Sequence, residues 1–189
     1  MIKVKILFIV LGLFFMNWSY AHEPNRAFFE IAVESNEVVV KAEFPWTIRE
    51  ALMQYDSNFK NAKTKSEILK ILFSYVNDNF KIKTLNDIQF QLLEVIELPN
   101  SGHTHGSEYK FIFKGKAANE IQNTLLFNLY ENQFNHHEVS LNGKSKKEYK
   151  TVKEKPNFIL KPVVKKSYTL WFLGIVIVGV IVWIVKKTI

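Results

Sequence analysis

The chain has 189 residues, no cysteine and a formal net charge of +7. The absence of cysteine excludes disulfides, a thiol nucleophile, thiolate metal sites and a lipoprotein anchor. The positive charge is concentrated in residues 144–166, which hold nine lysines and two glutamates, whereas residues 22–143 hold 12 basic and 16 acidic residues. No basic groove for nucleic acid is expected from this distribution, and we predict that the protein binds no nucleic acid.

Residues 1–21 are typical of a secretory signal peptide. Two lysines precede an apolar stretch over residues 6–16, and small residues occupy the two key positions of a cleavage site that ends at Ala21. The alternative is an uncleaved N-terminal anchor, although the apolar stretch is short for a bilayer, which requires about 20 apolar residues. Cleavage makes His22 the first residue of the secreted protein.

The first half of the secreted part is predicted to form a hairpin followed by two helices. Apolar and polar residues alternate over residues 29–33 and again over residues 38–44, as in two half-buried strands. Residues 47–50 and 64–67 each match the capping box, Thr-x-x-Glu, that begins a helix. The second helix also carries apolar residues along one face.

The second half is predicted to be rich in strands. The two-residue period returns over residues 80–83, 88–98 and 109–113. Residues 121–129 are apolar and ambiguous between a strand and a helix, because a short apolar run does not reveal its period.

Asn142-Gly143 is the strongest short-range signal for a hairpin in the chain. It joins predicted strands over residues 134–141 and 144–152. The expected fold is therefore mainly β: an antiparallel β-sandwich or open barrel with an inserted helical pair, over residues 22–152. One C-terminal transmembrane helix is expected in addition.

That helix is predicted over residues 167–185, because residues 168–185 contain no charge and have aromatic residues near both ends. A basic juxtamembrane stalk is predicted over residues 153–166, and residues 186–189 form a short cytoplasmic tail. The predicted location is the cell inner membrane, with a single span and the domain on the periplasmic side. The basic stalk and the helix then contact membrane lipid.

The last four residues, Lys-Lys-Thr-Ile, also match the dilysine retrieval signal of eukaryotic type I membrane proteins. A protein of the endoplasmic reticulum is therefore the alternative location.

The pattern of the secreted part resembles that of a known group of domains. The residues that carry the resemblance are 21–24, 73–82, 121–127, 131–136 and 142–144. They are similar to small secreted domains of unknown function from Bacteroidota, which resemble the extracytoplasmic N-terminal domain of HupE/UreJ-type accessory membrane proteins. The resemblance implies an extracytoplasmic module near metal handling, without an established catalytic residue. Those relatives continue into several membrane helices, so the single span expected here does not imply transport.

Five histidines are candidates for binding a metal such as copper, zinc or nickel. His22 would offer both its α-amine and its imidazole after cleavage, a pair that suits copper. His103 and His105 are two residues apart in a glycine-flanked loop, so both side chains point to one side if the loop is extended. His136 is expected to face outward from a strand, whereas its neighbour His137 shares the parity of apolar residues and is expected at the edge of the core.

No motif of a hydrolase, a metalloprotease or a phosphate-binding loop is present, so we predict that the protein is not an enzyme. The expected function is that of a non-catalytic interaction or accessory module with a membrane-protein partner. The alternative is a domain that binds or delivers metal through its exposed histidines.

Overall fold

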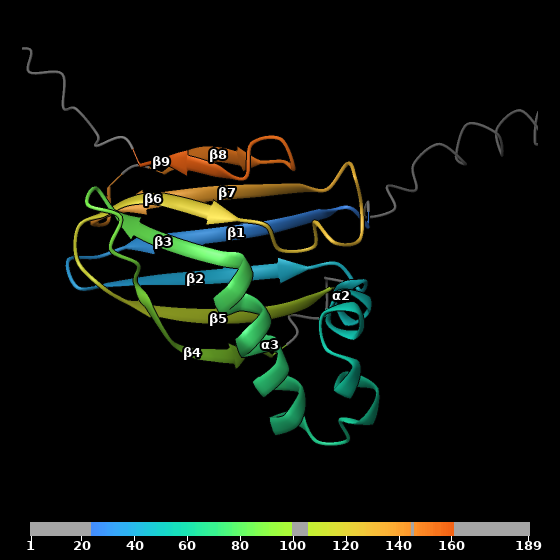
Figure 1. The fold of residues 1–189 in the computed structure, drawn as a ribbon. Coiled ribbons are helices and arrows are strands. Elements are labelled where there is room, and N and C mark those ends of the chain that lie inside the picture. Colours follow the sequence, from blue (N-terminus) through green and yellow to red (C-terminus); the bar gives the residue numbers. More distant parts are fainter. Residues whose placement is uncertain (1–23, 100–105, 145, 161–189) are drawn as a thin grey trace, which may run out of the picture.

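The computed structural model describes residues 24–99, 106–144 and 146–160 (Figure 1). In chain order the elements are β1 (Arg26–Val33), β2 (Glu37–Phe44), α2 (Ile48–Tyr55), the 3-10 helix η2 (Ser57–Asn61), α3 (Lys65–Asn79), β3 (Phe80–Thr84), β4 (Gln91–Glu97), β5 (Ser107–Lys114), β6 (Ala118–Asn123), β7 (Phe134–Leu141), β8 (Lys147–Thr151) and β9 (Asn157–Ile159). The fold is mainly β, with a pair of helices inserted after the first hairpin, as the sequence predicts.

The larger sheet has the strand order β4-β5-β2-β1-β7-β8. It is mixed rather than antiparallel, because β1 pairs with β7 in parallel, from Arg26 opposite Phe134 to Val33 opposite Leu141. The expectation of a wholly antiparallel sheet is therefore wrong. The alternation of apolar residues fixes which side of a strand is buried, but it carries no information on the direction of the neighbouring strand.

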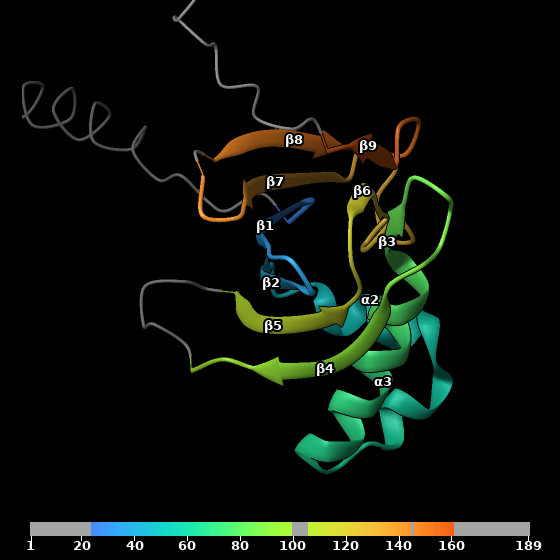
Figure 2. The same cartoon turned by 90° about the vertical axis from the view of Figure 1, so that its left-hand side faces the viewer.

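A smaller sheet, β3-β6-β9, and helix α3 cover one face of the larger sheet. Figure 2 shows the strands of the larger sheet stacked from β8 to β4, with the small sheet and the helices on one side of them. The hydrophobic core fills the space between these two layers. In the part of the chain that the structure describes, no helix or strand covers the other face of the larger sheet. We call this the open face.

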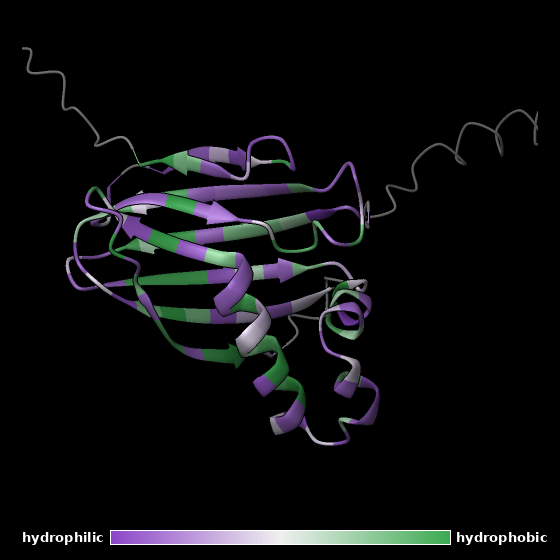
Figure 3. Cartoon of the chain, viewed as in Figure 1, coloured by the Kyte–Doolittle hydropathy of each residue, from purple (hydrophilic) through white to green (hydrophobic). Residues whose placement is uncertain are grey.

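The core is built largely from aromatic side chains. Colours alternate along the strands in Figure 3, because every second residue faces the core. The rings of Phe29, Phe44, Phe80, Phe111 and Phe113 are almost fully buried and pack against one another in edge-to-face, tilted and stacked arrangements. Each such ring contributes about 1.5–3 kcal/mol by leaving water, which suits a domain without disulfides.

The two predicted capping boxes differ in the structure. At α3 the box is confirmed: the Thr64 hydroxyl accepts a hydrogen bond from the Glu67 amide at 3.2 Å, and the Glu67 carboxylate accepts one from the Thr64 amide at 2.9 Å. At α2 the predicted box is wrong. Thr47 already has helical dihedral angles, φ −70° and ψ −7°, and its hydroxyl donates to the Pro24 carbonyl instead.

The ambiguous residues 121–129 divide between a strand and a turn. β6 ends at Asn123, and the following turn places Leu126 in the left-handed region with φ of 67° and no solvent exposure. The β7–β8 hairpin is confirmed. Asn142 and Gly143 both have positive φ, 49° and 65°, and the Lys144 amide donates to the Leu141 carbonyl at 3.1 Å, as in a type I′ turn.

The folded domain continues beyond its predicted boundary at residue 152. β9 pairs with β6, and Phe158 and Leu160 are buried in the core. Residues 153–160 of the predicted stalk therefore belong to the domain in this structure. The described residues contain no helix long and apolar enough to cross a membrane. The predicted signal peptide, transmembrane helix and cytoplasmic tail, residues 1–21, 167–185 and 186–189, lie outside the described residues.

The strands define two opposite ends of the domain. We call the end at which β1, β5 and β7 begin, and β2 and β4 finish, the N-terminal end; it lies on the right in Figure 1. The opposite end, where β9 finishes and the described chain leaves at Leu160, is the C-terminal end, and it faces the viewer in Figure 2.

Candidate functional site

Of the histidines predicted to bind metal, the structure describes His136. It lies in β7 on the open face of the larger sheet and is partly exposed, as the sequence predicts. His22, His103 and His105 lie outside the described residues. Among the described residues there is no group of three or more histidine, aspartate or glutamate side chains that could hold a metal ion.

His136 belongs to a surface cluster that we call the aromatic–cationic patch, which consists of Arg26, Phe28, Phe134, His136 and Lys150. The parallel pairing of β1 with β7 places Arg26 beside Phe134 and Phe28 beside His136. The antiparallel pairing of β7 with β8 places Lys150 on the other side of His136. Since strand residues of one parity share a face, all five side chains lie on the open face.

The patch is held together by ring contacts. The Phe28 and His136 rings are 5.9 Å apart between centroids. The Lys150 ammonium lies 5.1 Å from the centroid of the Phe134 ring, and the Arg26 guanidinium lies 6.0 Å from it. Both distances are within the range of cation–π attraction, worth about 0.5–1 kcal/mol at an exposed site. Even so, the Phe28 side chain, near the start of β1, remains 42% exposed and is available for an apolar contact.

The centre of the open face has a different character. A shallow hollow of about 180 Å³ lies above the small residues Ala32 and Ser140. Around it, Lys41 forms an ion pair with Glu108 at 3.0 Å, and Lys146 forms one with Glu138. The hydrogen bond to Glu108 raises the pKa of Lys41 above its usual value. These charges are paired within the protein, so they leave little net charge for a ligand.

His137 is fully buried and takes part in a polar network between the two sheets. Its Nε2 atom lies 2.9 Å from the Nδ2 atom of Asn123 in β6. Since an amide nitrogen can only donate, Nε2 is the acceptor and the ring is neutral. Burial lowers the pKa of His137 from 6.5 to about 3, and the nearby Tyr149 backbone offsets this only in part. The Nδ1 atom makes no hydrogen bond of good geometry.

The rest of this network explains why polar residues are tolerated in the core. The Asn135 amide donates to the Leu125 carbonyl at 3.0 Å, and the Asn123 carbonyl oxygen of the side chain accepts from the Leu125 amide at 3.0 Å. The Thr151 hydroxyl donates to the Asn123 backbone at 3.1 Å. These bonds satisfy the backbone of the turn after β6. The network is structural, since its side chains are buried and closed to a ligand.

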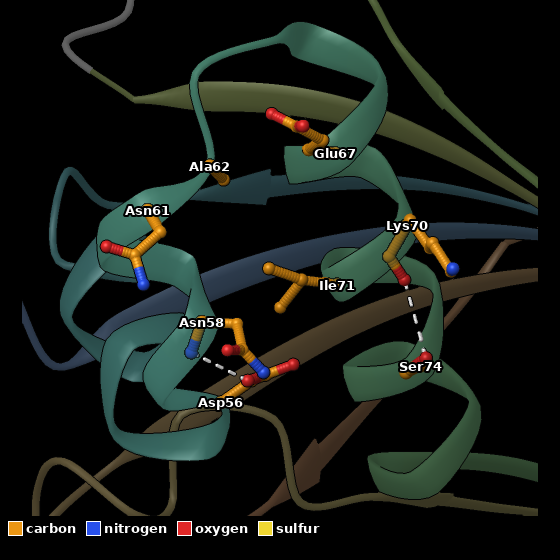
Figure 4. Close-up of a pocket in the computed structure, with 8 residues that line it drawn as sticks. All are labelled: Asp56, Asn58, Asn61, Ala62, Glu67, Lys70, Ile71 and Ser74. Carbon is orange, nitrogen blue, oxygen red and sulfur yellow. Dashed lines mark hydrogen bonds between the residues drawn. The ribbon is translucent and has the colours of Figure 1, made fainter.

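A pocket of about 360 Å³ lies between η2 and α3 (Figure 4). Asn58 and Asn61 are three residues apart on a 3-10 helix and therefore share one side of it. Ile71 of α3 points into the space between the two helices in Figure 4. The lining residues are Asp56, Asn58, Asn61, Ala62, Glu67, Lys70, Ile71 and Ser74.

The polar groups of this pocket do not form a catalytic arrangement. The Asp56 carboxylate accepts a hydrogen bond from the Asn58 amide, and the Glu67 carboxylate caps α3, so both are engaged with helix ends. The Ser74 hydroxyl donates to the backbone of its own helix at 3.4 Å and contacts no base. Nucleophilic catalysis requires a hydroxyl within hydrogen-bond reach of a base, and the described residues of this pocket do not provide that pair.

No protein-family model matches this sequence, and no curated protein matches it at a significant level. Any functional assignment therefore rests on the geometry of the domain.

Most of the aromatic–cationic patch could not be predicted from the sequence. Arg26 and Phe28 are separated from His136 by more than 100 residues in the chain, and only the parallel strand pair brings them together. One signal was available: Phe28 and His136 have the parity that faces away from the core in their strands. That signal gives the face of each residue, but not its neighbour.

Proposed function

We propose that the domain is a non-catalytic binding module, held at the periplasmic face of the inner membrane by the predicted helix over residues 167–185. In this proposal the aromatic–cationic patch binds an acidic segment of a membrane-protein partner. The observation that carries the proposal is the composition of the patch. Exposed aromatic and arginine side chains that lie together are among the residues that contribute most to protein–protein binding.

The charge of the patch determines the kind of partner. Arg26, Lys150 and the partly exposed His136 are basic or neutral, and Phe28 provides an apolar contact among them. Glu43, opposite Phe28 on β2, borders the patch on one side. A partner segment with a carboxylate near an apolar side chain complements this arrangement, since rim charges steer association and buried rings supply affinity.

Photo-crosslinking in cells tests the proposal. A photoreactive amino acid replaces Phe28 in the full-length chain, and as a matched control it replaces Ile112, on the open face of β5. We expect a discrete protein adduct from position 28 and none from position 112. Arg26→Glu combined with Lys150→Glu should abolish the adduct. Equal labelling at both positions, or an adduct unaffected by the two charge reversals, contradicts the proposal.

A metal-binding function is the second candidate, and one observation favours it. The described residues that flank the other predicted ligands lie at the same N-terminal end as His136. Pro24 is two residues after His22 and precedes β1, and Gly106, which follows His105, precedes β5. Since β1, β5 and β7 all begin at this end, the chain segments that carry these histidines are attached near one another.

Titration of the secreted domain with copper and zinc tests this second candidate. His103→Ala combined with His105→Ala should remove binding, and His136→Ala should weaken it. His137→Gln serves as the control, because that side chain is buried. The absence of binding tighter than about 10 μM, roughly −7 kcal/mol, rejects the metal-binding function.

A further inference from the structure

Four turns and the exit of the chain gather at the C-terminal end of the domain. The Asn142 amide donates to the Val33 carbonyl, and the Gly115 amide donates to the Asn36 carbonyl, so the β7–β8 and β5–β6 turns adjoin the β1–β2 turn. Thr84 pairs with Ala118 and brings the β3–β4 turn beside the start of β6. The Leu160 amide donates to the Asn119 carbonyl at 2.7 Å, so the described chain leaves beside the same strand. Figure 2 views this end.

This end exposes three aliphatic side chains. Leu85 and Ile88, in the β3–β4 turn, are 82% and 64% exposed, and Ile159 in β9 is 47% exposed. The turn is well ordered by its own hydrogen bonds: the Thr84 hydroxyl accepts from the Asn86 and Ile88 amides, and the Thr84 amide donates to the Ile88 carbonyl at 3.0 Å. Leu85 and Ile88 are therefore held outward by a formed turn.

Exposed lysines lie at the same end of the domain. Lys114, Lys116 and Lys144 lie at or beside the turns of this end and form no ion pair with another described residue. Lys83 is paired with Asp87 at 2.7 Å. Two exposed glutamates, Glu34 and Glu37, lie in and beside the β1–β2 turn. Beyond Leu160 the sequence adds Lys161, Lys165 and Lys166 before the predicted membrane helix.

We propose that the C-terminal end of the domain binds the surface of an anionic lipid bilayer, with Leu85 and Ile88 entering the headgroup region. The inference rests on the membrane anchor of the proposed function, which begins within seven residues of Leu160 in the sequence. A short tether keeps this end near the bilayer. Exposed aliphatic side chains and lysines at one end of a domain match an anionic interface, because the apolar groups enter it and the ammonium groups remain among the headgroups. The aromatic–cationic patch then lies at the end away from the membrane.

The absence of cysteine allows a direct test on the full-length chain. Single variants Leu85→Cys, Ile88→Cys and Trp46→Cys are labelled with the fluorophore NBD and reconstituted into vesicles. Trp46 is the matched control, since it is a large apolar residue, 66% exposed, beyond the end of β2 at the N-terminal end. The vesicles contain phosphatidylcholine alone or mixed with phosphatidylglycerol. Spin-labelled lipid reports contact with the bilayer by quenching.

We expect the probes at positions 85 and 88 to shift their emission to shorter wavelength and to be quenched on vesicles with phosphatidylglycerol. The probe at position 46 should remain as in water. The triple variant Lys114→Glu, Lys116→Glu and Lys144→Glu, or 1 M salt, which reduces the Debye length to about 3 Å, should remove the shift. Each lysine lost should weaken the contact about fivefold.

Equal emission from positions 46, 85 and 88 on both kinds of vesicle overturns the proposal, and so does a shift only in the presence of a second protein. Flotation after a carbonate wash reports separately on the anchor. If the chain does not float with the vesicles, both the predicted membrane anchor and this proposal are rejected. A chain that floats without a shift at positions 85 and 88 overturns this proposal alone, and the crosslink at position 28 still reports on the patch.

Discussion

The Nε2 atom of His137 lies 2.9 Å from the Nδ2 atom of Asn123, and this contact joins the larger sheet to the smaller one. The His137 ring also stacks on the Phe29 ring, with centroids 5.1 Å apart and planes at 16°. A neutral imidazole is therefore built into the middle of the core, where protonation would place a charge between two sheets.

The free energy of unfolding should fall as the pH decreases from 6.5 toward 3, because His137 is buried in its neutral form. The pKa of His137 is about 3 in the folded state, whereas its ordinary value, which applies to the unfolded chain, is 6.5. Between these values the unfolded chain binds a proton that the folded chain excludes, so stability rises with pH there, by up to about 1.4 kcal/mol per pH unit. The contribution is complete above pH 6.5 and is lost progressively toward pH 3.

Urea unfolding of residues 22–160 at pH 7 and pH 5 measures this effect. We expect the loss of stability between the two pH values to be smaller in His137→Gln than in the matched variant His136→Gln. Comparing the two variants removes the contribution of the carboxylates, which is common to both. An equal pH dependence in the two variants would show that His137 is not the group responsible.

Tyr75→Phe should destabilise the domain by about 1–3 kcal/mol, the cost of an unsatisfied buried amide. The Tyr75 hydroxyl accepts a hydrogen bond from the Leu126 amide at 2.8 Å and donates to the Asn128 side chain at 3.0 Å. Burial raises the pKa of Tyr75 to about 12, so the hydroxyl stays protonated over the working range of pH. The control is Tyr55→Phe, because the Tyr55 hydroxyl binds Asp78 at the surface. A similar decrease in stability for both variants, measured by thermal unfolding, would contradict this role of Tyr75.

Substitution by alanine should destabilise the domain at two glycine positions for different reasons. A Cβ atom at Gly115 would lie 2.4 Å from the body of the Phe90 ring, whereas one at Gly143 meets nothing within 4 Å. We expect Gly115→Ala to cost about 1–3 kcal/mol through overpacking. Gly143→Ala should cost about 1 kcal/mol through its φ of 65° alone. Adding Phe90→Leu should recover part of the loss at position 115 and none at position 143, as measured by urea unfolding.

Thr64→Ala should reduce stability by about 1 kcal/mol, the usual cost of losing a helix cap. Backbone and side-chain hydrogen bonds from Thr64, and one from the Lys63 backbone, lower the pKa of Glu67. Loss of the threonine hydroxyl should therefore raise that pKa toward its usual value, as NMR titration would show. Thr64→Ser keeps the hydroxyl and should preserve both stability and pKa. An unchanged Glu67 titration in Thr64→Ala would contradict the contribution of this cap.

The features that the sequence predicts well are those determined by a few neighbouring residues. Asn142-Gly143 makes a type I′ turn because both residues tolerate positive φ, and Thr64 with Glu67 caps α3 because three residues separate them. Thr47 and Glu50 have the same spacing, yet the Thr47 hydroxyl binds Pro24 instead. A partner distant in the chain decided that case.

The features that the sequence does not predict depend on which strands become neighbours. Phe28 and His136 meet only because β7 returns beside β1 in parallel. The burial of Phe158 and Leu160 depends in the same way on the pairing of β9 with β6, which is why the predicted stalk began too early. The aromatic–cationic patch is a feature of this second kind. The sequence predicts which face of the sheet each of its residues lies on, but not which residues are its neighbours.

The described chain enters the domain at its N-terminal end and leaves it at its C-terminal end, and this arrangement has a mechanical consequence. A force applied between Pro24 and Leu160 acts along the strands, because β1 begins at one end and β9 finishes at the other. The pairings of β1 with β2 and with β7 are then loaded in shear, so their hydrogen bonds resist together rather than opening one after another. β9 has only three residues paired with β6, so we expect this strand to detach first. Tension applied to the two ends of the described chain should therefore release β9 before it separates β1 from its neighbours.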